Sequence, residues 1–488
     1  MKKQFSAMIV ALGILLIFVS CSQESIPDST VKTDETTDTA AVETEYVFPQ
    51  VTYGGADFTV INSDAKVWGS GFSDIVIEEQ NGEILNDTVY DRNQQIEEMF
   101  NITLKQNAIH PSNVISEARK VIMSAEDVYD VMFLCHNWEG AIGTLALEGC
   151  FYDLADITEF QFDKPWWNQN IIDQLKIGSS DSLYFALNDI DVCNMQLPVI
   201  LYFNEKLMRD YDLDLPYNLV RNGKWTLDEF EKYLKAVANL NGDENWTWKT
   251  NGNSIYGYAS YHMGATAILI GTDVTIIDFK NNRIPYLAVE NERFYSAVQK
   301  LAKILSVEGQ YIYTDAVGAD RMGGVFKVGR SLFVDGALSN ANILRDIEDS
   351  FGILPMPKYD ENQQNYRTHM HSLATFTVIP VTNTEPDKAA SVADAMAYLS
   401  NKDVRPVYYD VALPYKQLRN EDSVDMLKII LDTRSIHIGY VYDWTTSFLN
   451  NDMRTAIWSK DPNIASLIEK NKNVINENIR KTLDYYNK

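Results

Sequence analysis

The chain has 488 residues, of which 45% are hydrophobic and 11% aromatic, so it can bury the core of two or three domains or of one large two-lobed unit. A formal net charge of −26 argues against nucleic acid and anionic lipid as partners of the folded body. After Cys21 only Cys135, Cys150 and Cys193 remain, without a CxxC pattern, so no disulfide framework is expected, although one pair could form.

A secretory signal is predicted at the start of the chain. Two lysines precede an apolar run from Phe5 to Val19, which is too short for a comfortable membrane span. The residues Phe18–Cys21 resemble the lipobox of bacterial lipoproteins. This resemblance implies that residues 1–20 are removed and that Cys21 carries a diacylglycerol on its sulfur. Two acyl chains, of the palmitate kind, anchor a protein stably where one does not. The alternative is a secreted protein with an unmodified Cys21.

A disordered tether is predicted over residues 21–49. Ser, Thr, Asp and Glu dominate this segment, and it offers almost nothing apolar to bury. Such an arm would let a folded body move through the volume near the membrane.

From about residue 54 onward, strand-like and helix-like segments alternate. Strands are predicted over 57–61 and 101–104, and helices over 88–100 and 114–123. The near-continuous apolar run over 129–134 is typical of a parallel strand that is covered on both faces. This alternation predicts an α/β fold with a doubly wound sheet.

A second set of elements starts near residue 204. Thr226 and Glu229 form a capping box, so a helix is expected to begin after Thr226. Helical spacing of apolar residues predicts further helices over 294–305 and 387–399, and 331–334 is predicted to be a short strand. No internal repeat of fixed period occurs. Two α/β sets in a chain of this length predict two lobes.

Five stretches of the chain carry a family resemblance. The first is YDVMFLCHNWEG followed by LEGCFYDLADI, which resembles the family's strand, cleft loop and turn. The next two are LYFALNDID with LPVILYFNEKLM, and GKWTLDEFEKYLKAV, which resemble the crossing segment and a helix of the second lobe. The last two are FKVGRSLFVDGAL with FGILPMPKYD, and HSLATFTVIPVTNTEPDKAASVADAMAYLS. In this order they resemble the sugar-binding type of the extracellular solute-binding proteins of ABC importers, family 1, over residues 54 to about 440.

The resemblance implies a two-lobed, periplasmic-binding-protein-like α/β fold with crossing hinge strands and a solute between discontinuous lobes. The first lobe is expected over 50–203 and 374–430, and the second over 204–373 and 431–488. The function implied is a membrane-anchored extracellular receptor that captures a carbohydrate by hinge closure and delivers it to the permease subunits of an ABC transporter. A monomer without enzymatic activity, cofactor or metal is expected. Leu338 stands where many sugar binders carry an aromatic side chain, so the solute itself stays open.

Candidate ligand contacts follow the predicted strands, because ligands of open α/β sheets bind beyond the carboxyl ends of strands. Asn137 and Trp138 follow the apolar run of the first lobe, and Asp189 and Asp191 follow the next apolar segment. The alternative for Trp138 is a place in the core, and the alternative for the two aspartates is a solvated turn.

Further candidates come from the crossing segments and from aromatic loops. Trp166 and Trp167 are adjacent, so one is expected to stack on the ligand and the other to pack inward. Gln196 precedes a crossing strand, and Trp444 lies near the third expected crossover, where it could form a platform for a sugar. Asp335 ends a predicted strand, and a structural capping role is an equal alternative.

His369 and His371 are two residues apart, so in a strand both imidazoles would share a face and could reach the cleft. A metal site is the less favoured alternative, because Zn²⁺ usually takes three or four protein ligands and no third is placed by spacing. Structural roles for both histidines stay open.

A surface-anchored glycan hydrolase is the alternative function. Acidic residues are plentiful, and Glu139 follows Trp138 directly. A glycosidase needs two carboxyl groups about 5–5.5 Å apart for retention or about 6.5–9.5 Å apart for inversion. The sequence does not exclude such a pair.

Overall fold

The computed structural model describes residues 46–68, 72–138, 140–249, 251–344, 347–412 and 421–486. Cys21 and the predicted signal, and with them most of the predicted tether, lie outside the described residues. The chain divides into the units Met1–Val47 and Phe48–Lys488, and the fold below is that of the second unit. None of the described helices combines the length and the apolar composition that a bilayer span requires.

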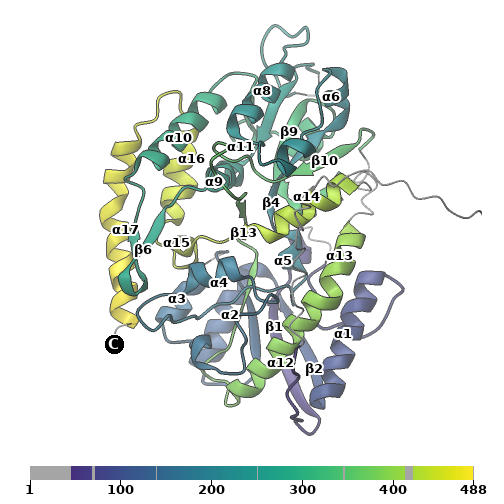
Figure 1. Cartoon of the computed structure of the whole chain (residues 1–488), viewed down its shortest axis with the longest axis vertical. Coiled ribbons are helices and arrows are strands. Elements are labelled where there is room, and N and C mark those ends of the chain that lie inside the picture. Colours follow the sequence, from purple (N-terminus) through teal and green to yellow (C-terminus); the bar gives the residue numbers. More distant parts are fainter. Residues whose placement is uncertain are drawn as a thin grey trace, which may run out of the picture. The chain divides into compact units, whose positions relative to one another are not determined.

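The first lobe is built on a four-stranded sheet with the strand order β12-β3-β1-β2 (Figure 1). The central strand β3 is buried at every residue, and because successive side chains point to opposite faces, both faces are covered, as its apolar run predicts. β1 is parallel to β2 and β3, whereas β12 is antiparallel to β3, so the sheet is mixed. The strands are β1 (Ala56–Ser63), β2 (Ile102–Ile109), β3 (Val131–Cys135) and β12 (Thr375–Val378).

The helices of this lobe begin earlier than apolar spacing alone predicts. α1 (Ile84–Phe100) starts four residues before the predicted range, and it ends where Asn101 adopts a left-handed conformation with φ 48°. α2 starts at Pro111, where the ring of His110 accepts a hydrogen bond from the Ser112 N–H at 3.2 Å. In α2, a proline and a polar cap open the helix before the first apolar residue of its stripe, Val114, so this first turn carries no apolar signal. The helices are α1, α2 (Pro111–Met123), α12 (Pro386–Leu399) and α13 (Arg405–Ala412).

The second lobe is built on a five-stranded sheet with the order β10-β4-β9-β5-β8. β5 is parallel to β8 and β9, and β4 is antiparallel to both β9 and β10. The two sheets and their helices confirm the predicted two-lobed α/β fold (Figure 1). The strands are β4 (Val199–Asn204), β5 (Tyr256–Ser260), β8 (Tyr311–Tyr313), β9 (Ser331–Ala337) and β10 (Phe351–Leu354).

The predicted cap of α8 (Leu227–Val237) is present in one of its two halves. The Thr226 hydroxyl accepts a hydrogen bond from the Glu229 N–H at 3.5 Å, which fixes the first turn. The Glu229 carboxylate pairs with Lys232 at 2.5 Å. The other helices of this lobe that matter below are α9 (His262–Gly271) and α10 (Glu292–Leu305).

Three chain segments cross between the two sheets and lie side by side. The His371 N–H donates to the Leu197 carbonyl at 2.9 Å, and the Thr368 N–H donates to the Thr433 carbonyl at 2.9 Å. The short strands β11 (Thr368–His369) and β13 (Arg434–Ser435) pair in parallel. These backbone bonds define the hinge of the molecule.

The lobe limits expected from the sequence stay a prediction, but two elements bear on them. β4 pairs within the five-stranded sheet, so the first crossing ends at Pro198, before the expected limit of residue 203. α14 (Glu421–Asp432) contacts β10, although the expected first lobe extends to residue 430.

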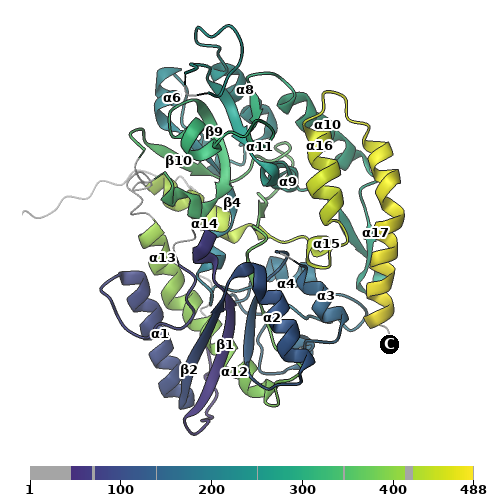
Figure 2. The same ribbon diagram turned by 180° about the vertical axis from the view of Figure 1, so that it is seen from behind.

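The C-terminal segment returns to the second lobe. α17 (Ile464–Tyr486) packs against the hairpin of β6 (Ile277–Lys280) and β7 (Ile284–Leu287), as the view from behind shows (Figure 2). Cys135, Cys150 and Cys193 are buried thiols, and none of the three takes part in a disulfide. The remaining α-helices are α3 (Ile142–Leu147), α4 (Gln169–Leu175), α5 (Cys193–Gln196), α6 (Glu205–Asp210), α7 (Tyr217–Arg221), α11 (Thr314–Val317), α15 (Ile438–Val441) and α16 (Arg454–Ile457).

Candidate functional site

A cavity of about 340 Å³ lies where strand ends of the two sheets meet. Its position agrees with the rule that ligands bind beyond the carboxyl ends of strands in open α/β sheets. The first lobe and the hinge supply Trp138, which follows β3, together with Leu197, His371 and Leu373. The second lobe supplies Tyr261 and His262 after β5, Arg321, and Ala337, Ser339 and Asn340 at the end of β9.

Two stacked pairs face the cavity, one from each side. Trp138 stacks on His371 with ring centroids 6.3 Å apart and an interplanar angle of 25°. The guanidinium of Arg321 lies over the ring of Tyr261, 3.5 Å from its centroid, and the Arg321 Nε donates to the Asp335 carbonyl at 3.1 Å. The flat surface of Trp138 and the fixed guanidinium are the kinds of group that recognise a sugar face and an acceptor oxygen.

His371 is a neutral hydrogen-bond donor. Burial, followed by the charges of His136, His262 and Arg321, lowers its pKa to about 3, so the imidazole is uncharged at neutral pH. Its Nδ1 accepts a hydrogen bond from the Leu373 N–H at 3.2 Å. In a neutral imidazole whose Nδ1 accepts, the proton is on Nε2. Nε2–H is therefore the polar group that His371 can offer to a solute.

A buried carboxylate supports the wall of the cavity on the side of the second lobe. Asp335 lies in β9 without exposed surface, and its Oδ1 accepts a hydrogen bond from the Tyr258 hydroxyl at 2.8 Å. Burial raises the pKa of Asp335, although the charge of Arg321 opposes the shift. The first turn of α9 approaches this group closely, because a Cβ at Gly264 would lie 2.5 Å from the Asp335 Oδ1. Asp335 thus holds the strand and the helix that frame the cavity and does not itself line it.

Of the residues predicted from the sequence, Trp138 and His371 line the cavity. Asn137 instead links the first lobe to the C-terminal segment, because its Nδ2 donates to the Tyr440 carbonyl at 2.7 Å and to the Thr446 hydroxyl at 3.0 Å. His369 lies beside the ring of Tyr440, at a centroid distance of 5.7 Å, and does not line the cavity. The two imidazoles contact different aromatic rings, Tyr440 for His369 and Trp138 for His371.

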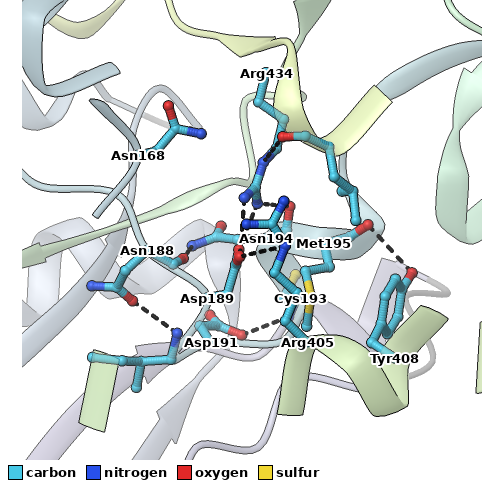
Figure 3. Close-up of polar contacts among 12 residues, drawn as sticks. Asn168, Asn188, Asp189, Asp191, Cys193, Asn194, Met195, Arg405, Tyr408 and Arg434 are labelled. Carbon is cyan, nitrogen blue, oxygen red and sulfur yellow. Dashed lines mark hydrogen bonds and ion pairs between the residues drawn. The ribbon is translucent and has the colours of Figure 1, made fainter. Parts of the chain in front are cut away.

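Asp189 and Arg434 form a buried ion pair in the hinge (Figure 3). Arg434 of β13 donates to both carboxylate oxygens of Asp189, at 2.6 and 3.0 Å, and to the Asn194 carbonyl at 3.3 Å. Burial raises the pKa of Asp189, but the charge and hydrogen bonds of Arg434 and the charge of Arg405 outweigh this and hold it below its ordinary value. This pair connects the third crossing to the first.

Asp191 and Gln196 also serve the hinge. The carboxylate of Asp191 accepts hydrogen bonds from the Cys193 N–H at 2.9 Å and from the Thr375 hydroxyl at 2.7 Å (Figure 3 shows the first of these). Burial raises the pKa of Asp191 to about 7. Gln196 is buried, and its Nε2 donates to the Phe72 carbonyl at 2.9 Å. Neither side chain lines the cavity.

The three other predicted tryptophans pack away from the cavity. Trp166 and Trp167 are both buried, and both indole N–H groups donate to one carboxylate oxygen of Asp394 in α12, at 3.2 and 2.7 Å. Trp444 is buried, stacks on Tyr442 at 5.1 Å, and donates to the Thr482 hydroxyl at 3.0 Å. Each of these indole N–H groups therefore donates a hydrogen bond to a residue that is distant in the sequence. Buried indole N–H groups usually have such a hydrogen-bond partner.

Sequence reasoning missed the side of the cavity that belongs to the second lobe. Tyr261 and His262 follow β5 directly, so the strand-end rule would have found them if the YGYAS strand had been recognised. Arg321 begins a π-helical turn, Arg321–Phe326, in a glycine-containing stretch that carries no signal for a cleft position.

A second hollow, of about 370 Å³, lies on the hinge near α4 and the loop after α9. Arg283 crosses it, with its Nε donating to the Lys176 carbonyl at 3.3 Å, and Arg367 pairs with Asp273 at 2.8 Å. Both arginines are therefore already engaged by groups of the protein, and no strand of the four-stranded or the five-stranded sheet ends there. We therefore assign the solute site to the cavity of Trp138 and His371. Across the described parts of the chain, no three His, Cys, Asp or Glu side chains form a group that could hold a metal ion.

No protein-family model and no curated protein matches the sequence, whereas many solved structures match the fold. A cyclic α-maltosyl-1,6-maltose binding protein from Arthrobacter globiformis has a TM-score of 0.56 at 11% identity, covering 87% of this chain and 99% of that one. An ABC substrate-binding protein from Listeria monocytogenes in complex with cycloalternan has a TM-score of 0.54 at 12% identity, covering 88% and 99%.

A third structure is an ABC transporter solute-binding protein from Thermotoga lettingae bound with α-D-tagatose, with a TM-score of 0.51 at 12% identity, covering 87% of this chain and all of that one (100%). At such identities the likeness concerns the fold. The fold implied by the resemblance is thus confirmed: the chain has the two-lobed fold of solute-binding proteins of ABC transporters.

Proposed function

We propose that this protein is a lipid-anchored receptor on the outer face of the cell membrane that captures a carbohydrate and presents it to an ABC transporter permease. The observation that carries the proposal is the cavity that both lobes line at their strand ends, within this particular fold. A solute there touches both halves of the molecule, so it favours the closed arrangement by its differential affinity for closed over open.

The groups around the cavity suit a saccharide. Trp138 offers an apolar face for C–H groups, while the neutral His371 and the side chains of Ser339 and Asn340 can exchange hydrogen bonds with hydroxyls. A net gain of about 1 kcal/mol per neutral hydrogen bond and about 1.5–3 kcal/mol per charged one makes micromolar binding, about 8 kcal/mol, reachable from a handful of contacts.

Two further lines support the proposal. The solved structures reported above include proteins in complex with cycloalternan and with α-D-tagatose, both carbohydrates. The lipobox-like residues Phe18–Cys21, followed by a polar tether, support anchoring at the membrane, where a permease would be reached.

A glycan hydrolase is the less supported alternative. Its chemistry needs a pair of carboxyl groups beside the scissile bond. The cavity lining that the structure describes contains no Asp or Glu side chain, and Glu139 lies outside the described residues.

The test is a titration of the purified protein with mono- and oligosaccharides, followed by calorimetry and by chromatography of the sugar. We expect at least one saccharide to raise the melting temperature, to bind stoichiometrically, and to be recovered unchanged. X-ray scattering should then give a smaller radius of gyration at saturation than without the sugar. Cleaved sugar would identify an enzyme, and the absence of binding by any saccharide would remove the carbohydrate assignment.

A further inference from the structure

The described lining of the cavity contains one permanently charged side chain, and it is a cation. Arg321 lines the cavity, and the described lining otherwise consists of neutral or titratable groups without a carboxylate. Among the described residues no carboxylate oxygen lies within ion-pair distance of an Arg321 nitrogen. A partly buried guanidinium without a carboxylate in direct contact, in a protein with a net charge of −26, is a feature that needs an explanation.

The carboxylates nearest in sequence and structure are engaged elsewhere. Asp320, the neighbour of Arg321, accepts a hydrogen bond from the Gly323 N–H at 3.0 Å. Asp315 accepts from the backbone N–H of His262 at 3.0 Å and lies 2.9 Å from the ring of the same residue. Asp335 receives the Tyr258 hydroxyl at 2.8 Å and offers its backbone carbonyl, not its carboxylate, to Arg321.

The guanidinium of Arg321 is held in place by neutral partners. Its Nε donates to the Asp335 carbonyl at 3.1 Å, and its plane lies over Tyr261 at 3.5 Å. No hydrogen bond engages its two terminal nitrogens among the described residues, so the fork that binds a carboxylate at two points is left for a solute. Its orientation is thereby fixed before a ligand arrives, which lowers the entropic cost of binding.

Further hydrogen-bonding side chains line the same cavity as this cation. His371 presents Nε2–H, as derived above, and the side chains of Ser339 and Asn340 each offer a donor and an acceptor. The terminal nitrogens of Arg321 and the Nε2–H of His371 can only donate, and the described lining has no carboxylate. Such a lining fits a solute with surplus acceptor oxygens.

We propose that the cavity binds an acidic saccharide, in which Arg321 receives the carboxylate of a hexuronate residue and Trp138 carries a face of a sugar ring. This inference rests on the proposed function and specifies its substrate class. The net charge of −26 does not oppose it strongly, because charges more than about 8–10 Å from the ligand are largely screened at physiological ionic strength, whereas a contact in the cavity is not.

Calorimetry with matched sugar pairs tests the inference. The probes are di- and trisaccharides of galacturonate, glucuronate and mannuronate, each paired with the same sugar after reduction of its carboxylate to a primary alcohol. We expect at least one acidic probe to bind tenfold or more tightly than its neutral partner, which corresponds to about 1.4 kcal/mol.

Variants separate the role of Arg321 from a loss of folding. Arg321→Gln should reduce the preference for the acidic probe to less than threefold, and Arg321→Lys, which keeps the charge but lacks the fork, should keep part of it. Arg209→Gln is the matched control, because Arg209 belongs to the same lobe and its side chain is 61% exposed. Unfolding midpoints of all three variants are measured alongside.

The outcomes are distinct. If neutral probes bind as tightly as acidic ones, or if Arg321→Gln weakens both by the same factor, the acidic-sugar inference is overturned while the receptor function stands. If no saccharide of either kind binds, the proposed function fails and the inference fails with it.

Discussion

Removing the carboxylate of Asp189 should destabilise the hinge, because the positive charge of Arg434 then stays buried without its partner. In Asp189→Asn the guanidinium of Arg434 stays buried, with only 2% of its side chain exposed, and loses both charge-assisted bonds at 2.6 and 3.0 Å. Breaking one partner of a buried pair costs about 3–5 kcal/mol, because the remaining charge is uncompensated.

The expected change in melting temperature follows from the size of the folded unit. Phe48–Lys488 comprises about 440 residues, and an unfolding entropy of about 2.1 cal/mol/K per residue gives about 0.9 kcal/mol/K for the whole unit. A loss of about 3–5 kcal/mol therefore lowers the melting temperature by about 3–5 °C. Urea unfolding followed by circular dichroism at pH 7 measures the free energy, and a thermal scan measures the shift.

The matched control is Asp273→Asn, which breaks the exposed pair with Arg367 at 2.8 Å, where the side chains are 41% and 31% exposed. Exposed pairs contribute about 0–1 kcal/mol, so this variant should shift the melting temperature by about 1 °C or less. A double variant, Asp189→Leu with Arg434→Met, should regain part of the loss because no charge stays buried. Equal losses of unfolding free energy in Asp189→Asn and Asp273→Asn would show that burial of the Asp189–Arg434 pair does not set the cost of breaking it.

The same pair gives a pH dependence with a definite sign. The pKa of Asp189 is lowered in the folded state. The contribution of the Asp189 carboxylate to the free energy of unfolding is therefore fully present above the ordinary carboxyl pKa of about 3.9, and it is lost as the pH falls through the pKa of the folded state. The difference in the free energy of unfolding between the wild-type protein and Asp189→Asn should therefore be constant from pH 7 to 5 and should shrink below about pH 4. A difference that disappears already at pH 6 would assign the effect to another group.

Three further outcomes are expected. Burial lowers the pKa of His136 to about 4 and of His369 to about 3, so the unfolded state binds more protons than the folded state below about pH 6.5. The free energy of unfolding should therefore fall on acidification by up to about 1.4 kcal/mol per pH unit for each of the two histidines. His369→Gln should lessen this slope in urea unfolding between pH 7 and 5, and an unchanged slope would contradict the burial of a neutral His369. Trp138→Ala should weaken binding of the best saccharide by about 2 kcal/mol in calorimetry without moving the unfolding midpoint, and an unaltered affinity would place the sugar elsewhere. Cys21→Ser should move the protein from the membrane fraction to the soluble fraction and abolish labelling with a radioactive fatty acid, whereas continued membrane recovery would exclude the lipid anchor.

The sequence by itself determined several of the elements and the position of Trp138 after the end of one of them. The apolar run that became β3 predicted a strand buried on both faces, because alternate residues of a strand face opposite sides and all are apolar. Thr226 and Glu229 predicted the start of α8, since a helix start depends on local hydrogen bonds. The rule of strand ends then brought Trp138 to the cavity, because the end of a strand is a local property of the chain.

Only the tertiary structure decided which polar and aromatic side chains face the solute. Trp166 and Trp167 donate hydrogen bonds to Asp394, which is more than two hundred residues away in the sequence. Asp189 accepts a hydrogen bond from Arg434 at a similar separation. Arg321, in a turn with no local signal, reaches the cavity because β9 and β5 pack against that turn. Helices and strands form from contacts between near neighbours, whereas a binding site consists of contacts between segments whose proximity exists only after both lobes have folded.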